Sequence, residues 1–175
     1  MQEIEETKSW IEKFVIKLDL CPFAKHPFSN GKIHFAVETS DQTEIQLTSF
    51  WKEIERLEIT DSKDISNSIL ICPTGLDDYF DYLELIDLCE GLLKLQKVEN
   101  LFQIASFHPN YLFEGLNADD VKNFTNRSPY PMIHILRVEE VSAAIEFYDD
   151  VDEIPKKNKA TLEELGFEKI KKGLF

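Results

Sequence analysis

The residue types best suited to bind or transform a small molecule gather in two segments of the chain, 21–37 and 101–137. These 54 of 175 positions contain all four histidines, five of the seven prolines and two of the three arginines. They carry five basic and three acidic side chains, hence a charge of +2, whereas the rest of the chain carries −16. A locally positive region on an acidic protein favours a pocket for a small anion, because the acidic surroundings otherwise repel such a ligand.

Arg127 is the strongest candidate for an anion anchor, since one guanidinium can donate two hydrogen bonds to a carboxylate or phosphate. Asn126 and Ser128 flank it with further polar groups, and Pro129 and Pro131 restrict the backbone that follows. We expect Arg127, Asn126 and Ser128 to bind the ligand. The alternative, in which Arg127 braces its own loop through internal carboxylates or carbonyls, stays open.

His108 is expected at the end of a strand, where an imidazole facing a crevice can act as general acid or base. Cys21 and Tyr130 are the other candidate catalytic groups, and Tyr111 and Lys25 are further candidates for ligand binding. A thiol becomes nucleophilic only when a cation or a helix N-terminus lowers its pKa, and Cys21 follows a helix C-terminus. A buried inert Cys21 and a His108 that bonds backbone carbonyls are the structural alternatives.

Cys21 and the histidines could also hold zinc, because thiolates and imidazoles are its usual ligands. The sequence contains no CxxC, HxH or HExxH, so such a site needs distant segments, and no metal ligand is assigned. His134 shares a strand face with Met132 and Leu136 and is expected to be a core histidine. GxGxxG, GxxxxGK[ST] and GxSxG are also absent, so the sequence names no cofactor.

Hydrophobic periodicity predicts the elements that position these residues. Strands are predicted over 32–38, 68–72, 101–107 and 132–138, and helices over 4–18, 44–54, 77–95, 139–148 and 161–172. Strands that alternate with long helices indicate right-handed, parallel βαβ units. We expect an α/β fold, a single two- or three-layer domain over 1–175 with a mixed, mostly parallel sheet of four to five strands and flanking helices.

Two irregular stretches complete this organisation. The 25 residues from Phe107 to Pro131 form a long loop of the kind that usually carries function. If the strands around it are antiparallel neighbours, His108 and Arg127 lie at the same end of the sheet. The charged span from Asp149 to Lys159 is expected to be a solvated loop, or a linker that leaves the last helix, 161–172, peripheral.

Three motifs occur in one order along the chain: LCPFA at 20–24, SFHP at 106–109 with FEG at 113–115, and NRSPYPMIH at 126–134. Together they resemble the bacterial family known as domain of unknown function 1415, over nearly the whole chain. The resemblance implies a single domain and supports the choice of segments. It implies no reaction, cofactor or catalytic residue, because none is established for that family.

Composition excludes several classes of protein. The hydrophobic fraction of 43% is enough to build a core, and the net charge of −14 opposes binding to nucleic acids and anionic membranes. No apolar run is long enough to span a bilayer and residues 1–6 are acidic, so a cytoplasmic location is expected. Three cysteines make an odd count, so reduced thiols are expected. Two hypotheses stay open, an enzyme acting on a small anionic metabolite and a non-catalytic small-molecule-binding or regulatory module. The oligomeric state is not predicted.

Overall fold

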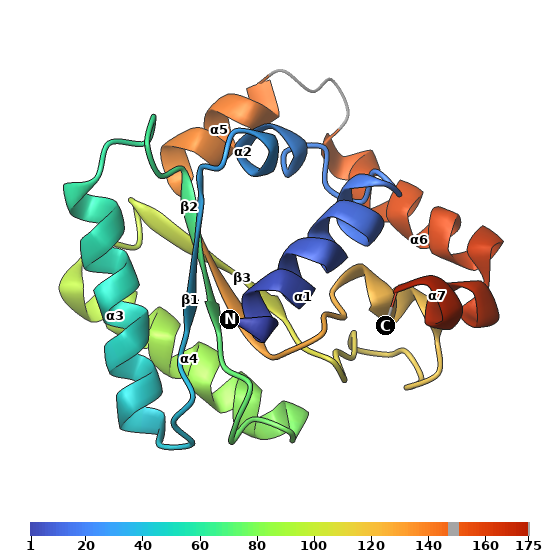
Figure 1. The fold of residues 1–175 in the computed structure, drawn as a ribbon, viewed down its shortest axis with the longest axis horizontal. Helices are drawn as coiled ribbons and strands as arrows, with labels where there is room; N and C mark the ends of the chain where they lie inside the picture. Colours follow the sequence, from blue (N-terminus) through green and yellow to red (C-terminus); the bar gives the residue numbers. More distant parts are fainter. Residues whose placement is uncertain (147–150, 175) are drawn as a thin grey trace.

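The computed structural model describes residues 1–146 and 151–174 of the chain, with side chains described to residue 170. Within this part, four strands form one sheet in the order β1-β2-β4-β3 (Figure 1). Their bounds are β1 (Ile33–Val37), β2 (Asn67–Ile71), β3 (Phe102–Phe107) and β4 (Met132–Arg137). The predicted α/β fold and the positions of all four strands are confirmed.

Strand directions differ from the expected mostly parallel sheet. β1 and β2 pair in parallel, whereas β4 lies between β2 and β3 and pairs antiparallel with both. β1, β2 and β3 therefore point the same way, and insertion of the reversed β4 makes two of the three pairings antiparallel. The cause is the connection between β3 and β4, which lacks the long crossover helix that a parallel return requires.

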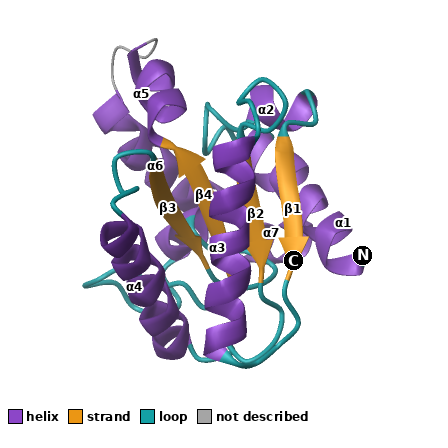
Figure 2. Cartoon of the chain, turned by 90° about the vertical axis from the view of Figure 1, so that its left-hand side faces the viewer, coloured by secondary structure: helices purple, strands orange, loops and turns teal. Residues whose placement is uncertain are grey.

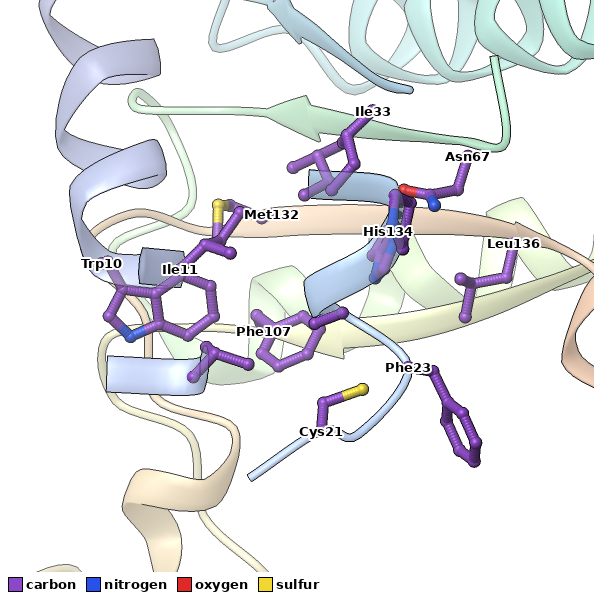
Figure 3. A pocket seen from close by; sticks show the side chains of 14 residues that line it. Trp10, Ile11, Cys21, Phe23, Ile33, Asn67, Phe107, Met132, His134 and Leu136 are labelled. Carbon is purple, nitrogen blue, oxygen red and sulfur yellow. Dashed lines mark hydrogen bonds between the residues drawn. The ribbon is translucent and has the colours of Figure 1, made fainter. Parts of the chain in front are cut away.

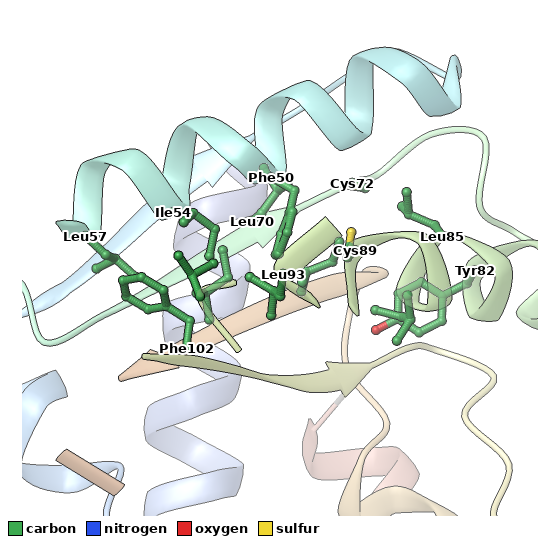
Figure 4. Packing of buried hydrophobic residues seen from close by; sticks show 14 of the residues in the cluster. Phe50, Ile54, Leu57, Leu70, Cys72, Tyr82, Leu85, Cys89, Leu93 and Phe102 are labelled. Carbon is green, nitrogen blue, oxygen red and sulfur yellow. The ribbon is translucent and has the colours of Figure 1, made fainter. Parts of the chain in front are cut away.

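Helices cover both faces of the sheet, so the domain has three layers (Figures 1 and 2). On one face lie α3 (Thr43–Ile59) and α4 (Tyr79–Gln96). Figure 4 shows how Phe50 and Leu57 of α3 meet Leu93 of α4 and Phe102 of β3 in the core between them. These side chains are at most 4% exposed.

The opposite face is covered by both ends of the chain. From the N-terminal end come α1 (Gln2–Trp10) and a π-helix, η1 (Ile11–Ile16), and from the C-terminal end come α6 (Ile154–Leu165) and α7 (Phe167–Leu174). Phe14, Leu162 and Ile170 are fully buried there. Asn158 of α6 also donates a hydrogen bond of 2.6 Å to the carbonyl of Leu20. The C-terminal helices thus form part of the domain core.

The expected solvated loop at 155–159 is wrong, because α6 already begins at Ile154. Pro155 occupies the first turn of α6, where its missing N–H leaves no helical hydrogen bond unmade. The expected helix at 161–172 is two helices, separated at Gly166, whose φ is +73°. Asp149, Asp150 and Tyr148, which the sequence assigned to the charged span and the preceding helix, lie outside the described residues.

The remaining described elements are short: α2 (Lys25–Ser29), η2 (Val121–Thr125), α5 (Val138–Glu146) and η3 (Val151–Glu153). Across the described residues, no helix combines the length and apolar character needed to cross a membrane.

Candidate functional site

The two motifs around His108 and Arg127 meet at one end of the sheet, as the antiparallel arrangement of β3 and β4 predicts. The backbone N–H of His108 donates to the carbonyl of Asn126 at 3.2 Å, and the side-chain amide of Asn126 donates to the carbonyl of Ser106 at 3.1 Å. We call residues 106–111 and 126–131 the loop rim. Sequence reasoning thus placed these segments correctly relative to each other.

His108 is fully buried in the loop rim, and hydrogen bonds to the backbone occupy both of its ring nitrogens. Nε2 donates to Leu76 O at 2.8 Å, and Nδ1 accepts from Asn110 N–H at 3.0 Å. Burial lowers the pKa of His108 against the opposing effect of the bond to Leu76 O. These contacts are those of a bracing histidine, and its role as general acid or base stays a prediction.

Arg127 also directs its donors at its own loop. Nε donates to Tyr111 O at 3.2 Å and Nη2 donates to Ala118 O at 2.6 Å. Its guanidinium lies 4.8 Å from the centre of the Phe124 ring, and burial lowers its pKa. Both carbonyls belong to the 107–131 loop, so the arrangement is that of loop bracing.

Three of the other candidates, Tyr111, Ser128 and Tyr130, belong to the loop rim, and each side chain contacts a different partner. Ser128 is buried and donates to Tyr130 O at 2.6 Å, while the Tyr130 hydroxyl bonds the Glu6 carboxylate, which raises the pKa of Tyr130 to about 12. The Tyr111 ring packs 5.0 Å from that of Phe113, and Lys25 is exposed. Their roles in binding or catalysis stay predictions.

Cys21 lies in a different place, at a cavity between the N-terminal segment and the α1 face of the sheet (Figure 3). We call it the sheet cavity. Its volume is about 100 Å³, and it is partly open to solvent. The side chains that line it are Trp10, Ile11, Val15, Cys21, Phe23, Ala24, Pro27, Ile33, Asn67, Ile69, Phe107, Met132, His134 and Leu136. None of them is acidic, lysine or arginine, so its only basic side chain is an imidazole.

His134 supplies the main polar group of the sheet cavity. Its Nε2 donates to Asn67 Oδ1 at 2.9 Å, across the β2–β4 pairing. Nδ1 makes no hydrogen bond with the described residues and is not sealed from the cavity. Burial lowers the pKa of His134 to about 4, so at neutral pH the ring is uncharged and Nδ1 presents a lone pair.

Cys21 reaches the sheet cavity from the segment that follows η1, so it and His134 come from opposite walls (Figure 3). Burial raises the pKa of the Cys21 thiol, although the backbone N–H groups of Phe23 and Ala24 act in the opposite direction. The thiol is therefore protonated at neutral pH and can donate or accept a weak hydrogen bond.

The wall beside Ile11 and Val15 has unusual backbone geometry. Lys17 N–H bonds Glu12 O at 3.2 Å, and Leu20 N–H bonds Val15 O at 2.9 Å, both across five residues. This widened turn is the π-helical form, which is uncommon and frequently accompanies functional sites. On the same wall, the indole N–H of Trp10 is buried without a hydrogen-bond partner among the described residues.

Sequence reasoning included Cys21 among the candidates and assigned His134 to the core. The alternation of Met132, His134 and Leu136 places His134 on the correct face of β4. It does not reveal the cavity in front of that face. Asn67 was the available signal, since a buried amide opening an apolar strand needs a polar partner. Among the described residues, no three His, Cys, Asp or Glu side chains lie close enough together to hold a metal ion.

Fold and cavity together define a three-layer α/β protein with an apolar cavity against its sheet. Residues 2–172 match the family described as Protein of unknown function (DUF1415), and the chain therefore belongs to that family. Searches among curated proteins and among solved structures find no match.

Proposed function

We propose that this protein binds a small, uncharged and mostly apolar molecule in the sheet cavity. The observation that carries the proposal is the Nδ1 lone pair of His134 in an otherwise apolar cavity of about 100 Å³. A cavity of about 150 Å³ can hold a benzene ring. The partly open mouth of the sheet cavity lets a ligand of similar size extend toward solvent.

The lining favours a neutral ligand that carries a hydrogen-bond donor. A hydroxyl or an amide N–H aimed at His134 Nδ1 satisfies that nitrogen, and the apolar walls accept the rest of the molecule. A carboxylate or phosphate here would lose its hydration without meeting a cation, because no lysine or arginine lines the cavity. We therefore infer an alcohol, phenol or amide rather than an anion.

The sequence led us to expect an anionic metabolite, and its binding site would lie at the loop rim, beside Arg127 and His108. The donors of Arg127 already serve two carbonyls of its loop, and both ring nitrogens of His108 are engaged. An anion bound there has to displace these contacts. The sheet cavity needs no such displacement and is the better-supported site, whether it serves a binding module or an enzyme.

The test compares three probes of one shape, namely phenol, toluene and benzoate, by titration calorimetry at neutral pH. We expect phenol to bind roughly 10-fold more tightly than toluene, the worth of one net hydrogen bond of about 1.4 kcal/mol. Benzoate is expected to bind most weakly. If benzoate binds best, and Arg127→Lys weakens it, the ligand site is the loop rim and the proposal is wrong.

Two variants connect this ranking to the sheet cavity. His134→Leu removes the acceptor and keeps the apolar wall, so the preference for phenol over toluene should disappear. Ala24→Phe fills the cavity, so both probes should lose affinity, while circular dichroism checks that each variant is folded. Equal binding of phenol to the wild type and to both folded variants contradicts the assignment.

A further inference from the structure

We propose that the outward face of α4 is the contact surface of a symmetric dimer, in which α4 packs antiparallel against α4 of a second copy of this chain. The contact is centred on Leu88, Gly91 and Leu95. This interface is independent of the ligand proposed for the sheet cavity, because α4 covers the other face of the sheet (Figure 2).

The first observation is a stripe of exposed apolar side chains on α4. Leu88 is 48% exposed, Leu95 75% and Phe80 71%. Positions 88, 91 and 95 follow the spacing that places side chains on one helix face. The same helix buries Tyr82, Leu85, Ile86, Cys89 and Leu93 on its inner side. Its apolar residues thus form two faces, and only the inner face is covered.

Gly91 provides the second observation. It lies inside α4, where glycine costs up to about 1 kcal/mol relative to alanine. Its backbone φ is not positive, and a Cβ at this position would meet no atom within 4 Å. The fold of the single chain therefore gives no reason for a glycine here. Between Leu88 and Leu95 it leaves a notch that lets a second helix backbone approach closely.

Charged side chains beside the stripe favour antiparallel packing of the two helices, and they favour a second copy of this chain as the partner. Asp87 precedes Lys94 by seven residues, so these two exposed side chains lie on one flank of the helix, beside Leu88 and Leu95. Antiparallel packing about a two-fold axis near Gly91 sets Asp87 opposite the partner's Lys94, and symmetry repeats this pair on the other side of the axis. Parallel packing places the two copies of this flank on opposite sides of the contact, so Asp87 and Lys94 do not meet. The sequence of α4 is thus complementary to itself in one orientation, as a two-fold interface requires.

The size of this contact sets the expected affinity. Glu84 lies on the stripe between Phe80 and Leu88, so the contact is confined to the C-terminal half of α4. A pair of helices over a few turns buries on the order of 1,000 Å², which is the low end for specific interfaces. Repulsion between two chains of charge −14 weakens it further. We expect a dimer with a dissociation constant on the order of 10 µM.

Sedimentation velocity of the full chain from about 1 to 500 µM spans that range. The wild type should change from monomer to dimer, and Leu88→Glu should remain a monomer throughout. Ile145→Glu on α5 makes the same kind of change at an aliphatic side chain that is 39% exposed, and serves as the matched control that still dimerises. A wild type that is monomeric at every concentration, or a dimer unaffected by Leu88→Glu, overturns the proposal.

Charge reversal tests the orientation. Asp87→Lys and Lys94→Asp should each weaken the dimer roughly 10-fold through like-charge contacts across the axis, and the double variant should restore it. The wild type and the three variants have the same buried core, so circular dichroism should show the same helix content for all four proteins. If the double variant is as weak as the single variants, the antiparallel arrangement is wrong. Binding of a basic helical peptide without self-association contradicts a second copy as the occupant.

Discussion

A histidine with an unused ring nitrogen beside apolar side chains is the residue on which the proposed function rests. His134 keeps one tautomer because Nε2 donates to Asn67 Oδ1 at 2.9 Å, so Nδ1 is fixed as an acceptor. The loop rim shows the contrasting case, in which His108 uses both nitrogens on the backbone. The two histidines differ in the availability of a ring nitrogen for a ligand.

The low pKa of His134 makes stability depend on pH. The folded value is about 4 against an ordinary value of 6.5, so between these limits the unfolded chain binds a proton that the folded chain does not. Stability is therefore lost as the pH falls through this window. From pH 7 to pH 5 we expect a loss of about 2 kcal/mol from this residue.

Urea denaturation of the wild type and of His134→Gln at both pH values isolates this contribution from the many carboxylates. The wild type should lose about 2 kcal/mol more than the variant between pH 7 and pH 5. An equal loss in both proteins contradicts a depressed pKa at His134.

Cys21 should react slowly with alkylating agents, and faster than Cys72 and Cys89. Burial raises the pKa of all three thiols, but Cys21 is half-buried at the sheet cavity whereas the other two are fully buried. Mass spectrometry after iodoacetamide treatment measures each site. Phenol should slow the alkylation of Cys21 alone, and unchanged kinetics with saturating phenol would place the ligand elsewhere.

At the scale of the elements, Tyr82 of α4 joins the ends of β3 and β4 that carry the loop rim. Its hydroxyl donates to Met132 O at 2.7 Å and accepts from Phe107 N–H at 2.9 Å. Tyr82→Phe leaves both buried groups without this partner, so we expect a loss of about 1–3 kcal/mol in the free energy of unfolding. Chemical denaturation measures it. Hydrogen exchange should accelerate at Phe107, with the amide of Ile69 as the control, and unchanged stability contradicts the account.

Gly75 shows how closely the loops after β1 and β2 pack. Its φ is +77°, and a Cβ there would lie 2.7 Å from the Cα of Asp41. Gly31 has a similar φ of +65° with no atom within 4 Å, so it is the matched control for the backbone conformation. We expect Gly75→Ala to cost at least about 1 kcal/mol more than Gly31→Ala in thermal or chemical unfolding. Equal costs would mean that the loops move apart easily.

The strands were predictable from sequence because alternation is local, as at Ile33, Phe35 and Val37. The sheet order was not, since it depends on how the 107–131 loop returns the chain as β4 between its neighbours. The helix at Ile154 was missed because its charged first turn resembles a solvated loop, although Pro155 is a helix-start signal. The sheet cavity was missed because a gap between Cys21 and His134 has no sequence pattern of its own.

At the scale of the whole molecule, the two chain ends cover the same face of the sheet, and the N-terminal one encloses the sheet cavity. α1 and η1 cover one part of this face and α6 with α7 another, and Leu20 is tied to Asn158 across the two. The net charge of −14 lies on a body whose cavity lining contains no acidic, lysine or arginine side chain. Such a body repels anions at long range and leaves neutral molecules free to enter.

The most direct test of the central claim is ¹⁵N NMR of the His134 imidazole, free and with phenol. We expect an Nε2–H tautomer that does not titrate between pH 7 and pH 5, together with a shift of the Nδ1 resonance when phenol donates to it. The imidazole of His108 should not respond. Titration of His134 near its ordinary pKa, or an Nδ1 resonance unchanged by saturating phenol, would contradict a neutral-ligand site in the sheet cavity.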